Sequence, residues 1–468
     1  MKKYFWAAII LFICFSQVSA DIEQREVYIE INLPSRSLSL YMDGALLKEY
    51  PVCVGRSSAQ TPQGEYRVVY KTVDPYWLNK GTVVPPGPQN PLGKRWLGLT
   101  KSIGIHGNNR PESIGTYASA GCIRMYNRDV KELYDIVPVN TPVVIKYDRI
   151  GIFEDKYTGK KAALVYPDSY KRGNASDSRL LQRLSEQETP DAVVEKAAEL
   201  LKKSLARPRA VSSGIGIFLN ESLVTCDAVG EQGKIYVNCK AAEDVLGLNA
   251  AMAEQFSIDT IEVEDTVYVN LTQLVEEYGG SISYDAAEAN AYISMQTIRI
   301  NGVFAGLNHG DIDKEDILEL EAVKQLDYDY SEDSVDIRVF DKGIMKLKRN
   351  KTWCVNTDNL VEALGGSKSV DSRCGIVDLT LPTFLRFEEE YYKTETLDGR
   401  LAIDPETAAY ISARTGRAEE AFSAEGVKPG RTVELEHFLE NYEYESNSFG
   451  TVIDIRSKEI QFSAGDGE

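Results

Sequence analysis

The chain has 468 residues, of which 43% are apolar and 26% are charged, so it is too apolar for a disordered protein. Its formal net charge of −19 argues against a protein that tracks nucleic-acid phosphates, because such binding depends on lysine and arginine. The acidic residues are unevenly distributed along the chain. Residues 21–148 hold 15 basic and 13 acidic residues, so the excess of acidic residues lies in the rest of the chain. This asymmetry indicates modules with different tasks.

The first 20 residues have the pattern of a secretory signal peptide. Lys2 and Lys3 precede an apolar run over residues 5–15, and Val18-Ser19-Ala20 is a small-x-small cleavage sequence. The alternative is an uncleaved membrane anchor. We predict that residues 1–20 are a signal peptide, and that the protein is exported across the cytoplasmic membrane to the cell wall or periplasm.

Residues 26–148 are predicted to be mostly β. Alternating apolar residues predict strands from Val27 to Leu33, around Tyr66-Val68-Tyr70, and at 143–147, and Asp43-Gly44 predicts a hairpin turn. One helix is predicted at 128–137, with Asn127 as its N-cap. Glycine and proline crowd residues 81–98, which predicts a long surface loop of the kind that carries binding sites.

Residues 149–213 are predicted to be an extension and a helical linker. The helical part falls in two pieces within 177–207, and Thr189-Pro190 is a typical start for the second piece. One apolar face of that piece contains Val193, Ala197, Leu200 and Leu201.

Residues 214–465 contain an internal repeat. A strand, a capping Asn or Thr, a short helix, Gly-Gly and a second strand ending in Asp occur at 268–285 and again at 353–371, and weaker copies begin near Tyr236, Asp316, Arg400 and Thr432. Such units are too small to bury an apolar face alone, so we predict tandem α+β repeats that pack together. They hold no cluster with metal-ligand spacing, which favours recognition or spacing over chemistry.

Six cysteines remain after the predicted signal peptide. If the protein is exported they are candidates for disulfides, because thiols outside the cytoplasm tend to form them. Local pairs Cys226–Cys239 and Cys354–Cys374 are the expected disulfides within the repeats. Cys53 and Cys122 remain, and the residues alone allow either a disulfide between them or two free thiols.

The chemistry points to His106 and Cys122. His106 lies in Ile-His-Gly and Cys122 follows sixteen positions later in Ser-Ala-Gly-Cys-Ile-Arg. A free cysteine is only a few per cent thiolate at neutral pH, and an imidazole within reach can take its proton. Backbone N–H groups in the turn at Gly121 and Cys122 are suited to an oxyanion, and Arg124 is suited to a substrate carboxylate. The structural alternative is a Cys53–Cys122 disulfide, with His106 as a histidine packed in the core.

Several separated motifs in residues 26–148 resemble the YkuD-type L,D-transpeptidases of bacterial cell-wall assembly. In the family's order they are Gly55-Arg56, residues 61–66 (TPQGEY), residues 90–93 (NPLG), residues 105–107 (IHG) and residues 119–124 (SAGCIR). The resemblance implies a mostly-β transpeptidase sandwich with Cys122 reduced, and Cys53 as a buried free thiol. Residues 215–465 resemble the copper amine oxidase N-terminal-like domains of bacterial surface proteins, a name that implies no copper site.

The resemblance also implies roles for individual residues. Cys122 is the expected nucleophile and His106 the general base, oriented by the Gly107 carbonyl. Ser119, Gly121 and the Cys122 amide are expected to shape the turn and the oxyanion pocket, and Arg124 to contact substrate. Many family members have histidine where this chain has Ala120, so any role of that second imidazole is absent here.

The implied reaction is a 3→3 cross-link between peptidoglycan stem peptides, formed through a thioester on Cys122. If water, in place of an amine, accepts the acyl group, the protein is an L,D-carboxypeptidase. The non-enzymatic alternative is an inactive wall-binding scaffold. No metal or organic cofactor is expected. The expected partners are stem peptides for the catalytic domain and a cell-wall or surface component for the repeats, with no nucleic acid.

Overall fold

The computed structural model describes residues 26–456 except 80, 174, 188, 248–256, 278, 309–315, 329, 333–335, 341, 350–351, 389, 398–399, 404, 415–432, 436–438, 440–442 and 448–449. The predicted signal peptide and the end of the predicted repeat region therefore lie outside the described residues. The chain divides into two compact units, residues 1–147 and residues 148–468. Among the described helices, none is both long enough and apolar enough to cross a membrane.

The first unit contains a five-stranded sheet. Its order is β3 (Ala45–Pro51), β2 (Ser37–Met42), β1 (Val27–Asn32), β13 (Pro142–Lys146) and β5 (Gly64–Arg67). The predicted alternation holds, since Ile29, Ile31 and Leu33 are fully buried. Asp43 and Gly44 both have positive φ in the turn between β2 and β3, as the predicted hairpin requires.

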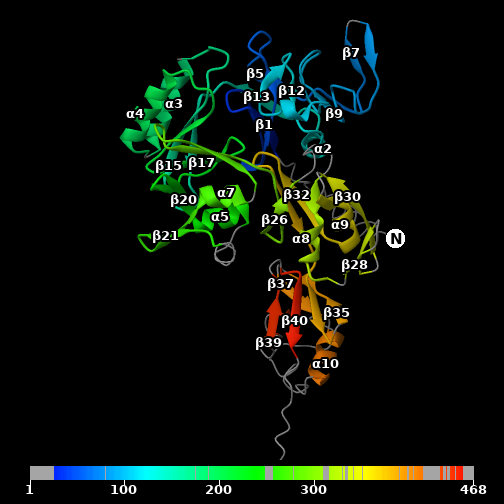
Figure 1. The fold of residues 1–468 in the computed structure, drawn as a ribbon. Helices are drawn as coiled ribbons and strands as arrows, with labels where there is room; N and C mark the ends of the chain where they lie inside the picture. The colour runs from blue at the N-terminus through cyan, green and yellow to red at the C-terminus, as the bar shows by residue number, and fades with distance from the viewer. Residues whose placement is uncertain are drawn as a thin grey trace, which may run out of the picture. The chain divides into compact units, whose positions relative to one another are not determined.

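A second, four-stranded sheet carries the candidate site (Figure 1). Its order is β12 (Ile123–Arg124), β10 (Gly104–His106), β9 (Arg95–Gly98) and β6 (Tyr70–Val73). Leu97, Ile105 and Ile123 align across three of these strands and are fully buried, so this face of the sheet packs into the core. Two further pairs complete the unit's strands, β4 (Val54–Gly55) with β11 (Tyr117–Ser119), and β7 (Trp77–Asn79) with β8 (Thr82–Val84).

Two predictions for this unit are wrong in detail. The Tyr66-Val68-Tyr70 alternation is not one strand, because β5 ends at Arg67 and β6 begins at Tyr70 in the other sheet. The buried Val68 lies between the two strands. Residues 81–98 are not one loop, because they contain β8 and end in β9, whose Leu97 is buried.

The predicted helix is α2 (Asn127–Ile136), which follows β12 and buries Val130 and Leu133. Asn127 is not its N-cap. Tyr126 occupies that position without a side-chain cap, and Asn127 is the first helical residue, with its amide hydrogen-bonded to two loops instead.

The second unit begins with a three-stranded sheet covered by two helices. The elements are β14 (Ile150–Glu154), β15 (Lys161–Val165), α3 (Ala175–Glu186), α4 (Asp191–Leu201) and β16 (Arg209–Val211). One core cluster joins Ala163 and Val165 of β15 to the apolar face of α4. Residues 149–213 thus fold as a small α/β layer, with more strand than the predicted helical linker.

The rest of the second unit has three sheets with the same strand arrangement. In each, the first strand of a hairpin pairs in parallel with a later strand, which has its own antiparallel partner. The sheets are β18 (Ser222–Thr225), β17 (Gly216–Leu219), β24 (Asn290–Ser294), β23 (Ser281–Asp285); β26 (Val303–Leu307), β25 (Thr297–Ile300), β33 (Ile376–Thr380), β32 (Ser367–Asp371); and β35 (Glu390–Lys393), β34 (Phe384–Phe387), β40 (Val452–Arg456), β39 (Glu443–Ser446).

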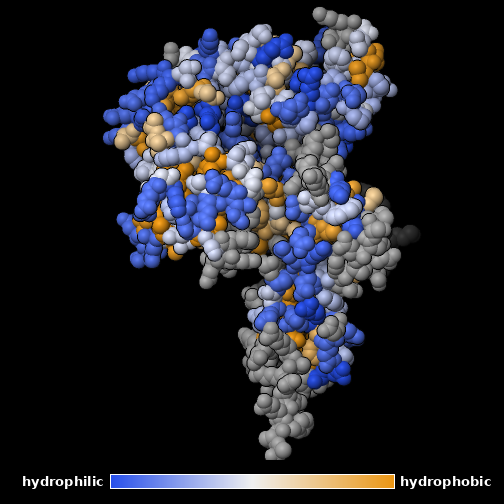
Figure 2. All heavy atoms as spheres, viewed as in Figure 1, coloured by the Kyte–Doolittle hydropathy of each residue, from blue (hydrophilic) through white to orange (hydrophobic). Residues whose placement is uncertain are grey.

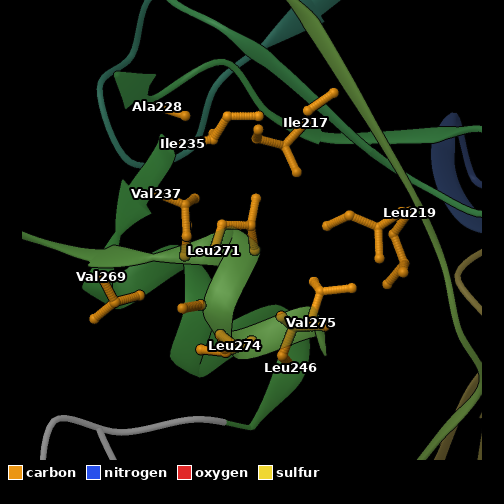
Figure 3. Close-up of a cluster of buried hydrophobic side chains, with 14 of the residues drawn as sticks. Ile217, Leu219, Ala228, Ile235, Val237, Leu246, Val269, Leu271, Leu274 and Val275 are labelled. Carbon is orange, nitrogen blue, oxygen red and sulfur yellow. The ribbon is translucent and has the colours of Figure 1, made fainter. Parts of the chain in front are cut away.

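Each of these sheets is accompanied by a second sheet and short helices. The second sheets are β19 (Ala228–Glu231), β20 (Lys234–Asn238), β22 (Thr266–Asn270), β21 (Thr260–Val263); β27 (Ile317–Glu319), β31 (Thr352–Asn356), β30 (Lys342–Arg349), β29 (Asp336–Val339), β28 (Tyr330–Glu332); and β36 (Glu395–Leu397), β37 (Arg400–Ile403), β38 (Val433–Glu434). The helices are α5 (Cys239–Leu246), α7 (Leu271–Glu277), α8 (Leu320–Lys324), α9 (Thr357–Leu364) and α10 (Pro405–Arg414). Figure 3 shows one core, in which Leu271 of α7 lies between Val237 and Ile217, and Leu274 and Val275 of the same helix belong to the same cluster.

The predicted disulfides within the repeats are wrong, because all six cysteines in the described part of the chain are free. Cys226 packs with Phe218 and Tyr292, whereas Cys239 packs against a different cluster. Cys354 lies on β31, while Cys374 lies in the turn after β32 and joins the core of the preceding sheet. Cys226 and Cys239, which are close in sequence, therefore pack in different clusters. The prediction that Cys53 is a buried free thiol is confirmed.

Candidate active site

The register of the second sheet brings the predicted catalytic pair onto one face. His106 lies opposite Arg124 in the parallel pair β10–β12, so Cys122, one residue before Ile123, lies beside Gly104. Side chains alternate along a strand, and Ile105 and Ile123 point into the core. His106, Cys122 and Arg124 therefore share the opposite face.

Aromatic residues cover the same face. Trp96 of β9 lies opposite His106, and their rings stack with centroids 5.4 Å apart and an interplanar angle of 19°. A Cβ atom on Gly104 would come within 2.6 Å of the Trp96 ring. Gly98, opposite Gly104, leaves room in the same way for the ring of Tyr70. The glycines thus let two aromatic rings lie against the sheet beside Cys122.

The turn that presents Cys122 is held by Ser119. The buried Ser119 Oγ accepts a hydrogen bond from Gly121 N–H at 3.1 Å and donates one to the Cys122 carbonyl at 2.6 Å. Gly121 has a φ of 119°, a conformation that side chains disfavour. The Gly121 amide is therefore occupied by the Ser119 hydroxyl.

Two motif residues far from Cys122 in sequence brace that turn. Arg56 N–H donates to the Ser119 carbonyl at 3.0 Å, where β4 pairs with β11. Gly55 N–H donates to the Thr61 hydroxyl at 2.9 Å, and a Cβ atom on Gly55 would overlap the backbone of residues 59–61.

The Cys122 thiol is partly exposed and mainly protonated. Its Sγ donates a hydrogen bond to the Ser102 carbonyl at 3.4 Å. Burial raises the pKa of the thiol above its ordinary value, against the opposing effects of a backbone hydrogen bond with Gly104 and the charge of Arg124. The thiolate is thus a minor species at neutral pH.

The His106 ring is buried and neutral. Its Nδ1 lies 2.6 Å from the Gly107 carbonyl oxygen, which can only accept, so in the neutral ring Nδ1 carries the proton and Nε2 is unprotonated. Burial lowers the pKa of His106 to about 4, although hydrogen bonds to the Gly107 and Leu92 backbone act in the opposite direction. No hydrogen bond joins the ring to Cys122 Sγ in the described part of the chain.

Cys122 opens into a pocket of about 490 Å³. The described residues that line it are mostly aromatic and apolar, with one cation among them: Tyr70, Thr72, Pro75, Tyr76, Trp77, Leu78, Leu92, Trp96, Lys101, Ser102 and Cys122. Part of the wall is the β7–β8 hairpin, and Figure 2 shows apolar atoms on its surface, at upper right. Asn90, fully buried, ties this region together, since its Nδ2 donates to the carbonyls of Pro75 and Val84 and its Oδ1 accepts from Leu92 N–H.

The sequence analysis predicted Cys122, His106, Gly107, Ser119, Gly121 and Arg124 as site residues, and the structure places all six within or next to the short parallel strands β10 and β12. The sequence analysis did not identify Lys101 or the aromatic wall of the pocket, which consists of Tyr70, Tyr76, Trp77 and Trp96. Tyr76-Trp77 before a proline-rich loop was a signal for the wall, but no sequence pattern connects Tyr70 with Trp96. Their proximity depends on the pairing of β6 with β9.

Comparison with known proteins places the first unit in a family. A family model described as YkuD, L,D-transpeptidase catalytic domain, matches residues 26–145. The putative L,D-transpeptidase YqjB of Bacillus subtilis is 38% identical over 147 residues, which are 30% of this chain and 82% of that protein. The putative L,D-transpeptidase YkuD of Bacillus licheniformis is 45% identical over 118 residues, 25% of this chain and 64% of that protein.

Solved structures also match this region. The catalytic domain of an E. faecium L,D-transpeptidase, solved by NMR, is 29% identical with a TM-score of 0.22, over 26% of this chain and 96% of that chain. An L,D-transpeptidase from Mycobacterium smegmatis is 18% identical with a TM-score of 0.23, over 26% of this chain and 59% of that chain. On the sequence matches, the chain belongs to the YkuD L,D-transpeptidase family, a family of transferases that cross-link peptidoglycan.

Proposed function

We propose that this protein is an exported L,D-transpeptidase that forms 3→3 peptidoglycan cross-links through a thioester on Cys122. The observation that carries the proposal is the register of β10 and β12, which puts Cys122 and His106 on one face of the sheet, where Cys122 lines an open pocket. The Gly107 carbonyl at Nδ1 supports the role of His106 as general base, because it leaves Nε2 free to accept a proton.

The first half of the proposed reaction forms the thioester. Cys122 Sγ attacks the carbonyl carbon of the third residue of a stem tetrapeptide, and its proton passes to His106 Nε2. The oxyanion that forms accepts a hydrogen bond from Cys122 N–H. The bond to the terminal D-alanine then breaks, and its amine leaves with the proton from Nε2.

The second half transfers the acyl group. The amine of a neighbouring stem attacks the thioester carbonyl, the C–S bond breaks, and the proton lost by the amine returns to Cys122 by way of His106. A new peptide bond results. If water attacks instead, the product is a trimmed stem with a free carboxylate, and the enzyme is an L,D-carboxypeptidase.

Export and the task of the second unit belong to the same proposal. Residues 1–20 would direct the chain across the membrane, to the cell wall or periplasm. The three similarly ordered sheets of the second unit support tandem α+β repeats over 214–465 of the copper amine oxidase N-terminal-like type. We propose that they bind or space a wall or surface component.

The test is incubation of the purified chain with disaccharide-tetrapeptide, followed by mass spectrometry. We expect release of D-alanine and a cross-linked dimer, and loss of both in Cys122→Ala. Cys239→Ala, which removes a partly exposed thiol from the second unit, is the control and should keep full activity. D-alanine release without dimer would favour the carboxypeptidase, and release undiminished in Cys122→Ala would refute the thioester.

A second prediction concerns Lys101, which is exposed and is the one cation among the described residues that line the pocket. No ion pair within the described residues involves it, so its charge is available to a substrate carboxylate. Lys101→Ala should raise KM for the tetrapeptide donor about 5- to 20-fold, consistent with the loss of one charged contact of about 1–2 kcal/mol, with little change in kcat. Lys131→Ala, on the exposed side of α2, is the matched control. Steady-state kinetics would check this, and an unchanged KM would contradict it.

A further inference from the structure

Asn127 uses its whole side-chain amide to join two loops. Its Oδ1 accepts a hydrogen bond from Lys94 N–H at 3.0 Å, and its Nδ2 donates one to the Asn108 carbonyl at 2.7 Å. Lys94 precedes β9 and Asn108 follows β10, so the amide bridges the segments at adjacent ends of two paired strands.

Two glycines fit closely around this amide. A Cβ atom on either Gly93 or Gly107 would collide with Asn127 Oδ1. Gly93 also has a φ of 64°, and Gly107 lies against the backbone of Gly93 and Lys94. We call this arrangement of Gly93, Lys94, Gly107, Asn108 and Asn127 the Asn127 clamp.

Both backbone segments of the clamp lead to the His106 ring. Gly107 supplies the carbonyl that accepts from Nδ1, and Leu92, one residue before Gly93, supplies the other backbone contact to the ring. Asn108 is itself fixed, because its Nδ2 donates to the Met125 carbonyl and its Oδ1 accepts from Arg110 N–H. The position of the Gly107 carbonyl therefore depends on a rigid network centred on Asn127.

We infer that Asn127 is a positioning residue for His106: through the clamp it holds the Gly107 carbonyl against Nδ1 and so keeps Nε2 free to accept a proton. The inference rests on the proposed function for its catalytic consequence. It does not rest on it for the geometry, since the tautomer of His106 is a property of the resting protein.

The test compares Asn127→Ala and Asn127→Asp with the wild-type chain. Asp keeps the size of the side chain and the acceptor for Lys94 N–H but loses the donor to Asn108, so it serves if the alanine variant fails to fold. Asn109→Ala is the matched control, because this neighbouring asparagine is exposed and its one side-chain hydrogen bond to a described residue goes to the Gln89 carbonyl.

Two readouts separate positioning from structure. In the ¹⁵N spectrum of the histidine rings, the Nδ1–H form of His106 should dominate in the wild type and in Asn109→Ala, and should be lost or mixed with the other tautomer in both Asn127 variants. In D-alanine release, kcat should fall 10- to 100-fold in the Asn127 variants, with KM changed less than twofold.

The two readouts also distinguish failure of the proposed function from failure of the inference about Asn127. If no protein releases D-alanine, the proposed function fails, and the ring spectrum still decides the inference. If the Asn127 variants keep the wild-type ring spectrum, the inference is overturned, whether kcat falls or not. An equal fall in kcat in Asn109→Ala would overturn it as well.

Discussion

Replacing His106 with glutamine is expected to lower the rate of Cys122 acylation by about 10²- to 10⁴-fold, the range typical for the loss of a general base. The Cys122 thiol needs a base, because burial raises its pKa and leaves little thiolate at neutral pH. The measurement is the rate of acyl-adduct formation, followed by mass, with a tetrapeptide donor or a carbapenem, whose opened ring would form a thioester on Cys122. A glutamine variant that acylates at the wild-type rate would contradict this assignment.

The same variant should change how the protein responds to acid. Burial lowers the pKa of His106 to about 4, whereas an imidazole in the unfolded chain has its ordinary value near 6.5. The unfolded state therefore binds the extra proton between pH 6.5 and pH 4. The contribution of the neutral buried ring to the free energy of unfolding is therefore fully present above pH 6.5. It is lost as the pH falls to 4, by about 3 kcal/mol in total.

Denaturant unfolding at several pH values checks this effect. The free energy of unfolding of the wild type should fall by up to that amount between pH 6.5 and pH 4, and the fall should be smaller in His106→Gln. For the enzyme, the acid limb of kcat/KM should lie near pH 4 instead of near 6.5, because the base stays unprotonated down to its lowered pKa. An acid limb at 6.5 would show that the ring titrates as if exposed.

Replacing Gly104 with alanine should impair both the pocket and the fold. The added Cβ atom would lie 2.6 Å from the Trp96 ring and 2.8 Å from the Leu97 carbonyl oxygen, so the ring must move away from His106 and Cys122. We expect a cost of about 1–3 kcal/mol in stability, typical of an overpacked site. Because a shift of about 1 Å near reacting groups can cost up to 10²-fold, kcat/KM should fall at least tenfold.

Gly343→Ala is the matched control for this substitution, since nothing lies within 4 Å of the position that its Cβ atom would take. Tryptophan fluorescence, thermal unfolding and D-alanine release would be compared for the two variants. If Gly104→Ala kept wild-type fluorescence and turnover, the prediction that the close approach of Gly104 and Trp96 is needed for activity would be contradicted.

Much of the candidate site could be predicted from short stretches of sequence. Motifs such as Ser119–Arg124 and Ile105–Gly107 are local, and the contacts within them are local too: Ser119 binds Gly121 and Cys122, and His106 binds the next carbonyl along the chain. Their expected roles in catalysis stay predictions. The fold of the first unit was predicted in outline, because apolar alternation marks a buried strand face.

The errors have a common physical cause, which is that a local pattern does not say which elements pair. Tyr66, Val68 and Tyr70 keep the alternation of one strand while the chain passes from one sheet to the next. Cys226 and Cys239 are close in sequence, but they pack in different clusters. Asn127 has the residue type and place of an N-cap, yet loops that arrive from elsewhere in the chain take its hydrogen bonds.

By itself, the sequence determined the β-rich character of the first unit, the acidic excess of the remainder, and the identities of the thiol, the imidazole and their flanking glycines. These properties depend on residue type and on spacings of a few residues. Only the tertiary structure decided that Lys101 and four aromatic rings line the Cys122 pocket, and that Asn127 bridges the loops around His106. Those neighbours are set by strand register and close packing between distant segments, and neither leaves a periodic mark in the sequence.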